Sequence, residues 1–212
     1  MNIHKVYGLF LPFFRRRRME RFVNTFRPTK ATRILDVGGG VLNWKLIRCE
    51  SRITILNLSV PSDASTFPPN FTFAKGDGTS LGYPDNSFDN AYSNSVIEHL
   101  FSWDNQVRFA KEISRVSRNV WVQTPARSFF VEPHLITPFI HFFPKTLQKR
   151  LLRNFTIWGL LGRPSQSQVD QFLDEVRLLT FKEMQTLFPD CTIHKERFLL
   201  FTKAYVAIRR TE

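Results

Sequence analysis

Residues 33–40 read Arg-Ile-Leu-Asp-Val-Gly-Gly-Gly, and this stretch is the strongest indication of the fold. An apolar run that leads directly into glycines is typical of a buried parallel strand. Because glycine has no side chain, the backbone after such a strand can approach a ligand closely. At the end of a first parallel strand, a glycine turn forms a nucleotide-type site beyond the carboxyl edge of the sheet. A dinucleotide-binding turn needs a third glycine, as in G-x-G-x-x-G, and residues 38–43 lack it.

The chain downstream of this stretch alternates between strand-like and helix-like segments. A helix is predicted from about Trp103 to Val116, because its apolar residues fall on one side and its charged residues on the other. This alternation predicts an α/β fold with a doubly wound parallel sheet. The strands are predicted over Arg52–Asn57, Phe71–Ala74, Phe88–Ser93 and Val120–Gln123.

Four short motifs follow one another in a characteristic order. They are Asp-Val-Gly-Gly-Gly at 36–40, Gly-Asp-Gly at 76–78, Pro-Asp-Asn-Ser-Phe-Asp at 84–89 and Ser-Val-Ile-Glu-His at 95–99. In this order and spacing, over roughly residues 30–124, the chain resembles the class I S-adenosylmethionine-dependent methyltransferases of the small-molecule family called type 11. The resemblance implies a Rossmann-like sheet of seven mostly parallel strands with an antiparallel last strand. Candidates for the closing pair are 192–198 and 201–208, joined by a tight turn.

The resemblance also implies S-adenosyl-L-methionine as the cofactor, and it assigns no metal. Two positions differ from the family pattern. Leu42 stands where a further glycine is usual, and Asn57 stands where an acid usually accepts the ribose hydroxyls; an amide oxygen is a weaker acceptor than a carboxylate. Asp63 could offer a carboxylate instead, although we expect a solvated turn residue there. The expected cofactor contacts are Asp36, Gly38, Gly39, Gly40, Asn57, Leu58, Asp77, Gly78 and Asn94.

The composition predicts one globular unit without an internal repeat. A chain of 212 residues that is 42% hydrophobic can bury a sizeable core. Cys49 and Cys191 lie far apart without metal-ligand spacing, so we expect free, at least partly buried thiols and a reducing, cytoplasmic setting. We divide the chain into a basic amino-terminal segment and helix over residues 1–30 and a methyltransferase domain over residues 31–212.

The positive charge is concentrated in two segments. Residues 1–30 carry a net charge of +7 and residues 141–163 carry +5, which together equal the +12 of the whole chain. The remaining residues, which include the expected catalytic core, are therefore neutral on balance.

Both basic segments also contain long apolar runs, one at 6–14 and one at 135–144. In the first run the basic residues follow the apolar ones, no small-residue cleavage site appears, and the run is too short to span a bilayer. We therefore expect neither a signal peptide nor a membrane span there. Apolar faces beside basic clusters suit peripheral contact with an anionic membrane surface. The alternative, which we favour as architecture, is a helical cap over the sheet; membrane contact is compatible with it.

The cap is expected over about residues 126–178, after the fifth strand, where this architecture places its substrate-side loops. A helix is predicted to open at Pro164-Ser165. Thr180 and Glu183 form a capping-box signature for a last short helix, which ends at Phe188-Pro189.

Methyl transfer requires a positioned nucleophile and, for a hydroxyl, a base within hydrogen-bond reach. His99, after the fourth strand, and His134, after the fifth, are the candidate bases. Glu132 could orient His134, and Arg127 could hold an anionic group of the substrate. A structural role is the alternative for each residue, and Glu98 is expected to face the cofactor side or to cap locally.

Some methyl acceptors can be discounted from residues 93–96, which read Ser-Asn-Ser-Val. Adenine amine methylation usually goes with Asn/Asp-Pro-Pro-aromatic after the fourth strand, and methylation of cytosine carbon 5 needs a cysteine there. We therefore expect oxygen methylation of a small or lipid-linked molecule, while a carbon acid or an amine of similar size stays open.

Two other classes of function are the alternatives. A nucleic-acid-binding module could read phosphates with the cluster Arg15–Arg18, but we find no recognition motif and no continuous basic face, so we do not expect a nucleic-acid partner. A nicotinamide-dependent oxidoreductase could use the same sheet, but the third glycine and the acid at position 57 are missing.

Overall fold

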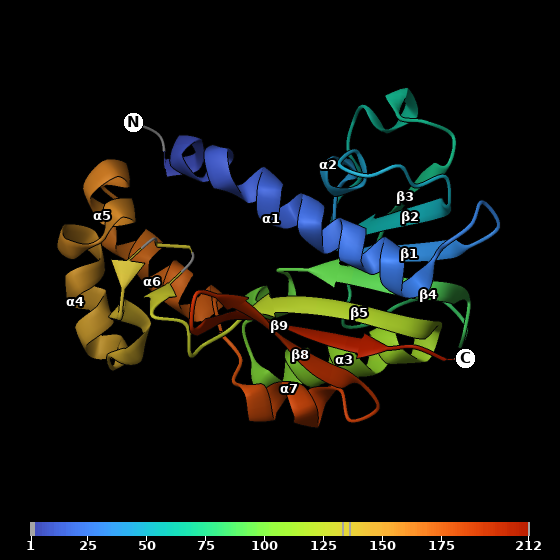
Figure 1. Ribbon diagram of the computed structural model, residues 1–212. Coiled ribbons are helices and arrows are strands. Elements are labelled where there is room, and N and C mark those ends of the chain that lie inside the picture. Colours follow the sequence, from blue (N-terminus) through green and yellow to red (C-terminus); the bar gives the residue numbers. More distant parts are fainter. Residues whose placement is uncertain (1–2, 133, 136, 212) are drawn as a thin grey trace.

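The computed structural model describes residues 3–132, 134–135 and 137–211, with side chains described from residue 14 onward. Its centre is a seven-stranded sheet of the predicted class (Figure 1). The strands are β1 (Arg33–Val37), β2 (Arg52–Asn57), β3 (Phe71–Lys75), β4 (Phe88–Asn94), β5 (Ser117–Pro125), β8 (Thr192–Phe198) and β9 (Phe201–Arg209). Their order is β3-β2-β1-β4-β5-β9-β8. Strands β1 to β5 pair in parallel, and β9 runs antiparallel to both of its neighbours, which confirms the expected closing pair.

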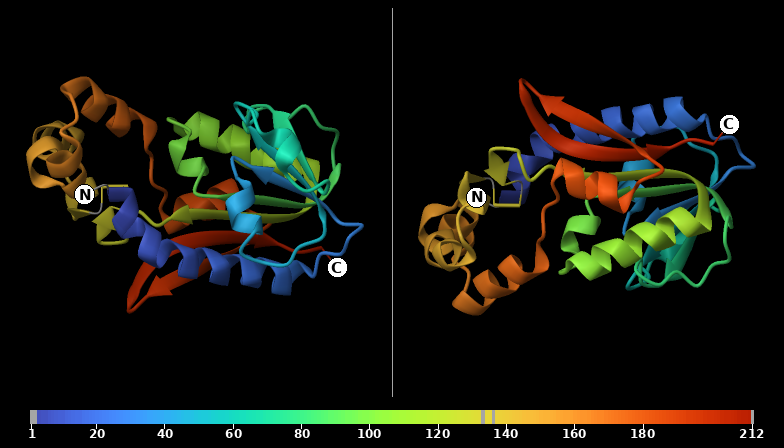
Figure 2. Two further views of the ribbon diagram at one scale, coloured as in Figure 1. Left: turned by 90° about the horizontal axis from the view of Figure 1, so that it is seen from above. Right: turned by 90° about the horizontal axis from the view of Figure 1, so that it is seen from below.

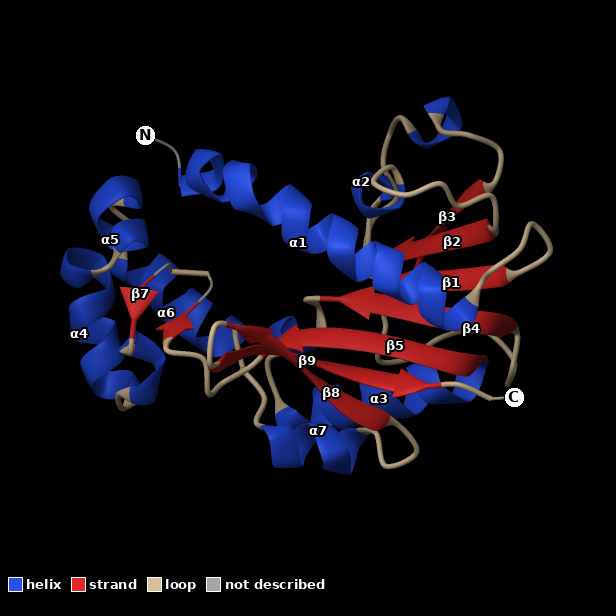
Figure 3. Cartoon of the chain, in the orientation of Figure 1, coloured by secondary structure: helices blue, strands red, loops and turns tan. Residues whose placement is uncertain are grey.

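Helices cover both faces of this sheet, as Figures 1 and 3 show. One face carries the long helix α1 (Ile3–Phe26) and the single turn α2 (Val41–Trp44), which follows the glycines. The other face carries α3 (Trp103–Val116) and α7 (Phe181–Leu187). Coverage of both faces explains why the central strands are apolar on both sides.

The core beneath α1 is aromatic. The Phe22 ring lies 5.2 Å from the Tyr92 ring, 5.7 Å from the Trp44 ring and 5.9 Å from the Trp121 ring, all in edge-to-face geometry. Such pairs add to the stabilisation that burial itself provides. The basic amino-terminal segment is thus anchored to the domain through one face of its helix, on which Met19 is also fully buried.

A second hydrophobic core lies on the other face of the sheet, beneath α3. The buried residues of this helix recur with the expected helical periodicity and include Phe109, Ile113 and Val116. The expected capping box of α7 is present. The Thr180 hydroxyl accepts from the Glu183 N–H at 3.2 Å, and the Glu183 carboxylate accepts from the Thr180 N–H at 2.7 Å. This reciprocal pair satisfies two backbone donors at the helix start.

The segment after β5 forms the expected helical cap, which projects beyond the carboxyl edge of the sheet (Figure 2). Its core contains Leu135, Ile140, Leu152, Val169 and Leu173. Pro133 and Ile136 of the predicted cap, and the side chains of the amino-terminal apolar run up to residue 13, lie outside the described residues. The cap comprises β6 (Val131–Glu132), β7 (Thr137–Pro138), η3 (Ile140–Phe142), α4 (Lys145–Phe155), α5 (Ile157–Gly162) and α6 (Gln166–Glu175).

Two further observations concern the whole described chain. Cys49 and Cys191 are free thiols of intermediate burial, as expected. No helix within the described ranges combines the length and the apolar character needed to cross a bilayer.

Candidate active site

The carboxyl ends of β1, β2, β3 and β4 meet at one edge of the sheet because these strands run in parallel. Backbone hydrogen bonds fix the two loops that leave this edge. The Gly38 N–H donates to the Leu56 carbonyl at 2.8 Å, and the Gly76 N–H donates to the Asn57 carbonyl at 2.9 Å. The glycine turn and the Gly-Asp-Gly turn are therefore both tied to β2.

The first two glycines of the turn are required by its shape. Gly38 has φ +72°, and a Cβ there would lie 2.6 Å from a methyl carbon of Val96. A Cβ on Gly39 would lie 2.0 Å from the carboxylate oxygens of Asp36. Gly40 differs, because within the described part of the chain nothing lies within 4 Å of the corresponding position. The loop is thus closed on its strand side and open at Gly40.

Asp36 is fully buried beneath this loop. One of its carboxylate oxygens accepts from Trp44 Nε1 at 2.8 Å, and the other has no hydrogen-bond partner among the described residues. Burial raises the pKa of Asp36 to about 7, against the smaller, opposing effect of the Trp44 hydrogen bond. Asp36 therefore supports the loop from below, and its predicted contact with the cofactor stays a prediction.

A cleft of about 600 Å³ opens in front of the loop. Gly39, Gly40, Leu42, Asn57 and the exposed Asp63 all line it. Asn57 Nδ2 donates to the Gly39 carbonyl at 3.0 Å. A carboxylate could not donate this bond, so the amide at the end of β2 has a structural use that the usual acid lacks.

The remaining predicted cofactor residues lie at the same edge without lining this cleft. Asp77 follows β3 and accepts from the Thr79 N–H at 2.8 Å. Gly78 packs closely on Phe109, and Leu58 is exposed at the end of β2. The Asn94 side-chain oxygen accepts from the Arg18 guanidinium at 2.8 Å, a contact with α1 that its position in the sequence does not suggest.

The predicted catalytic residues come together between β4 and the cap. His134 Nδ1 lies 2.7 Å from Glu132 Oε1, and the other oxygen of Glu132 accepts from the Leu135 N–H at 2.6 Å. The rings of His134 and His99 lie 4.8 Å apart. His99 belongs to the short helix η2 (Ile97–His99), so the cluster joins the exit of β4 to the β6–β7 hairpin.

Sequence reasoning missed the role of Glu98 in this cluster. Its side chain is fully buried, and one oxygen accepts from Thr124 Oγ1 at 2.9 Å. The other oxygen has no partner among the described residues. Burial raises the pKa of Glu98 to about 7, against smaller opposing effects that include the charge of His134. The only indication of this burial in the sequence was that Glu98 directly follows two apolar residues, Val96 and Ile97.

The surroundings of the two histidines shift their pKa values in opposite directions. Burial alone would lower the pKa of His134, but its hydrogen bond to Glu132 and the charges of Glu132 and Glu98 raise it above its ordinary value. Burial and the charge of His134 lower the pKa of His99. Titratable groups driven apart in this way are typical of sites that transfer protons.

Glu98, His99 and His134 could also hold a divalent metal, because they offer ligand atoms within 4.8 Å of one another. The hydrogen bond from His134 to Glu132 and the opposite pKa shifts of the two histidines also suit proton transfer, so the geometry is compatible with either role.

A second cleft of about 450 Å³ lies under the cap. It brings the predicted substrate residue Arg127 together with Glu132, His141 and Lys145. Phe172, whose ring centroid lies 6.2 Å from that of His134, also lines it. The cleft thus combines cationic groups with an apolar wall beside the proposed base.

Comparisons with solved structures give a consistent fold. Magnesium protoporphyrin IX methyltransferase from Synechocystis PCC 6803, with bound SAH, aligns at a TM-score of 0.61 and 11% identity, covering 99% of this chain and 89% of that chain. The YcgJ protein of Bacillus subtilis aligns at 0.54 and 16% identity, covering 84% and 70%. A SAM-dependent methyltransferase from Methanosarcina mazei aligns at 0.50 and 19% identity, covering 88% and 95%.

The sequence comparisons point in the same direction. No curated protein matches the sequence. Residues 35–119, which run from β1 into β5 and contain all four motifs, match the family model described as a methyltransferase domain, type 11. Residues 35–119 thus form a methyltransferase domain of type 11, within a chain that has the fold of S-adenosylmethionine-dependent methyltransferases.

Proposed function

We propose that the protein transfers the methyl group of S-adenosylmethionine to an oxygen of a small or lipid-linked molecule, with His134 as the general base. The observation that carries this proposal is the bond of 2.7 Å between His134 Nδ1 and Glu132. When Glu132 accepts the Nδ1 proton, Nε2 of the neutral ring is left as the acceptor. This base lies beside the cleft under the cap, where Arg127 could hold an anionic group of the acceptor.

The residues of the first cleft fit the cofactor. Gly40 leaves open space for a ligand, and the turn 38–40 has no side chain in the way. Asn57 and Asp63 present oxygens to the same space, which suits ribose hydroxyls. Asp77 and Asn94 would complete the contacts at the ends of β3 and β4. S-adenosylmethionine, when bound, supplies an electrophilic methyl group on a sulfonium.

The residues of the chain would position the acceptor and remove its proton. His134 Nε2 would take the proton of the acceptor hydroxyl, to which bound S-adenosylmethionine would supply the methyl group. Glu132 holds the ring in place and stabilises the imidazolium that results.

Calorimetric titration tests the cofactor assignment. S-adenosylmethionine and S-adenosylhomocysteine are expected to bind, and NAD is not. Asp77→Ala is expected to weaken the binding of both adenosyl ligands by about tenfold, since it removes a charged acceptor. Asp85→Ala, in an exposed loop, should leave both affinities unchanged. Binding of NAD without either adenosyl ligand would overturn the assignment.

The pH dependence of kcat/KM tests the base. Because His134 must be neutral to accept a proton, the rate is expected to rise with pH through the pKa of His134, which is raised above its ordinary value. Glu132→Gln removes the charge of Glu132, so that only the charge of Glu98 still raises this pKa against burial, which lowers it. The rising limb should therefore move to lower pH, and the plateau should fall because the ring is held less firmly.

The matched control is Asp174→Asn, which changes an exposed cap acid that pairs with Lys145 at 3.5 Å. Its profile should coincide with that of the wild-type protein. A rising limb that stays in place in Glu132→Gln would show that another group titrates in the reaction.

A further inference from the structure

The hairpin formed by β8 and β9 has an unusual tip. Its turn consists of Leu199 and Leu200, which are 79% and 90% exposed, and the flanking residues Phe198 and Phe201 are also exposed. Leu199 has φ +53°, a left-handed conformation for which tight hairpins normally use glycine or asparagine. Leu199 is therefore held in a conformation that disfavours leucine, and both leucines are presented to solvent, where hydration does not favour them.

A basic cleft of about 340 Å³ lies at the base of the same hairpin, between β8 and α1. Its only acid among the described lining residues is Glu196, which Arg18 engages at 3.1 Å. Trp121 also lines the cleft, and its buried Nε1–H has no acceptor among the described residues. The other lining cations are Arg17, Arg21, Lys195 and Arg197. The Arg21 guanidinium lies over the Trp121 ring and the Lys195 ammonium over the Phe181 ring of α7, so Arg17 and Arg197 are the cations with which we expect an anion to pair.

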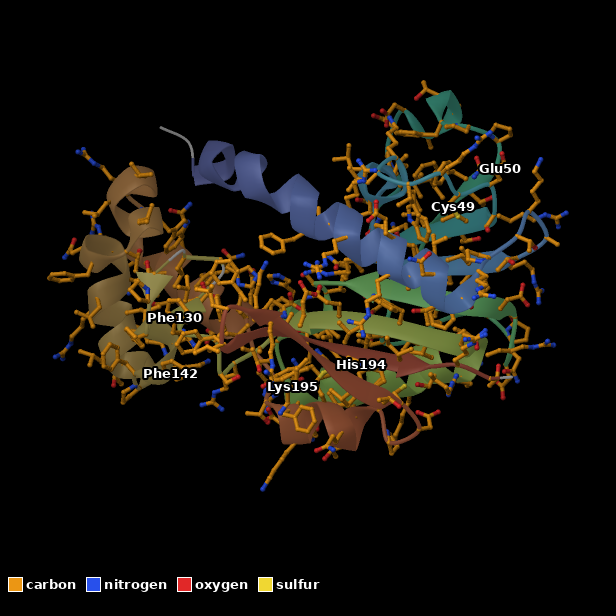
Figure 4. The ribbon with its side chains drawn as sticks, viewed as in Figure 1. Cys49, Glu50, Phe130, Phe142, His194 and Lys195 are labelled. Carbon is orange, nitrogen blue, oxygen red and sulfur yellow. The ribbon has the colours of Figure 1, made fainter. Side chains whose placement is uncertain are left out.

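The apolar tip and the basic cleft form one continuous surface. Phe14 lines the cleft, and its ring lies 6.3 Å from that of Phe198. On the other side of the tip, the rings of Phe201 and Phe130 lie 4.9 Å apart. Figure 4 labels Lys195 on β8 and Phe130 in the segment that leads from β5 into the cap, so the hairpin lies beside that segment.

We propose that this surface binds an anionic phospholipid bilayer. The tip Phe198–Phe201 enters the interfacial region, and the basic cleft binds the phosphate of a lipid headgroup. Apolar side chains that cannot span a bilayer, set beside a cleft in which cations outnumber acids, suit this combination of shallow insertion and charge attraction. A soluble phosphate compound would explain the cleft but not the leucines.

The surface lies at the catalytic edge of the molecule. Pro125, the last residue of β5, pairs with Ala204, so the tip of the hairpin extends past the carboxyl end of β5. The cap begins at the same end (Figure 2). If the proposed function holds, a docked protein would turn its active-site edge toward the membrane that carries a lipid-linked acceptor.

Co-sedimentation of the full-length protein with vesicles tests the proposal without any assay of methyl transfer. Phosphatidylcholine vesicles that contain phosphatidylglycerol are expected to bind the protein, and pure phosphatidylcholine vesicles are expected to bind it at least tenfold less. Leu199→Gly combined with Leu200→Ser should reduce binding by about tenfold or more, because it removes the apolar tip. Arg17→Ala combined with Arg197→Ala should reduce it by about 25-fold, or about fivefold for each cation.

The controls separate docking from folding. Leu199→Gly/Leu200→Ser places residues suited to the turn, so its melting temperature should be equal to or above that of the wild-type protein. Arg48→Ala, outside the cleft, and Leu160→Asp, on the exposed side of α5, should retain binding.

Three results would overturn the proposal. They are equal binding to both vesicle types, loss of binding in Leu160→Asp but not in the tip variant, and thermal stabilisation by inorganic phosphate without any vesicle binding.

Discussion

His134→Gln is expected to lower kcat by about 100- to 10,000-fold, the range by which a positioned general base accelerates proton transfer. Glutamine keeps a donor toward Glu132, so the β6–β7 hairpin should stay in place. The dissociation constant for S-adenosylmethionine should not change, because His134 does not line the cofactor cleft. Single-turnover rates of methyl transfer, together with calorimetry of cofactor binding, separate the two quantities.

His194→Gln is the matched control, since it makes the same exchange on β8, where Figure 4 labels His194. It should leave kcat unchanged. The wild-type protein should also keep its activity in the presence of a chelator, because a base needs no metal. Loss of activity with the chelator, and its recovery on addition of zinc, would assign Glu98, His99 and His134 to a metal instead.

Gly38→Ala is expected to lower the free energy of unfolding by about 2–5 kcal/mol and to abolish detectable cofactor binding. A left-handed conformation at φ +72° costs about 1–2 kcal/mol for any residue with a Cβ. Close contact with the methyl groups of Val96 adds about 1–3 kcal/mol of overpacking. Urea unfolding measures the loss of stability, and calorimetry with S-adenosylmethionine measures the loss of cofactor binding.

Gly40→Ala provides the comparison within the same turn. Its backbone has φ −161°, which any residue adopts, and its Cβ would meet open space. Its stability should match that of the wild-type protein. Adding Val96→Ala to Gly38→Ala should restore part of the lost stability, since it removes the contact but not the conformational cost. A Gly38→Ala protein as stable as Gly40→Ala would show that the turn is not constrained as described.

The sheet could be predicted because its signals are local. Arg52–Asn57 and Trp103–Val116 have the observed bounds, and the fifth strand only extends further at both ends than Val120–Gln123. Strand ends are harder to predict, since their pairing partners come from elsewhere in the chain. The single turn α2 was not predicted. It covers only part of its face of the sheet, and the rest of that face is covered by α1, which precedes β1 in the sequence.

The candidate site was predictable in part for the same reason. The glycine turn, Asn57 and Asp77 are recognised by their places after particular strands. Glu98 was not, because its importance depends on burial beside His134, which lies on a hairpin of the cap. No pattern in the sequence suggested that Arg18 would donate to Asn94 and pair with Glu196, since α1 and β8 are brought together only by folding.

The sequence by itself determined the order of strands and helices, the turn that has no room for side chains, and the residue types available for chemistry. These follow from periodicity, glycine conformation and side-chain chemistry, which act over a few residues. Only the tertiary structure decided which groups meet: Glu132 with His134 and His99, and the leucine tip with the arginine-lined cleft. Both sets join distant segments, and pKa values and surface charge depend on distances and burial that the packed sheet, helix α1 and the cap create together.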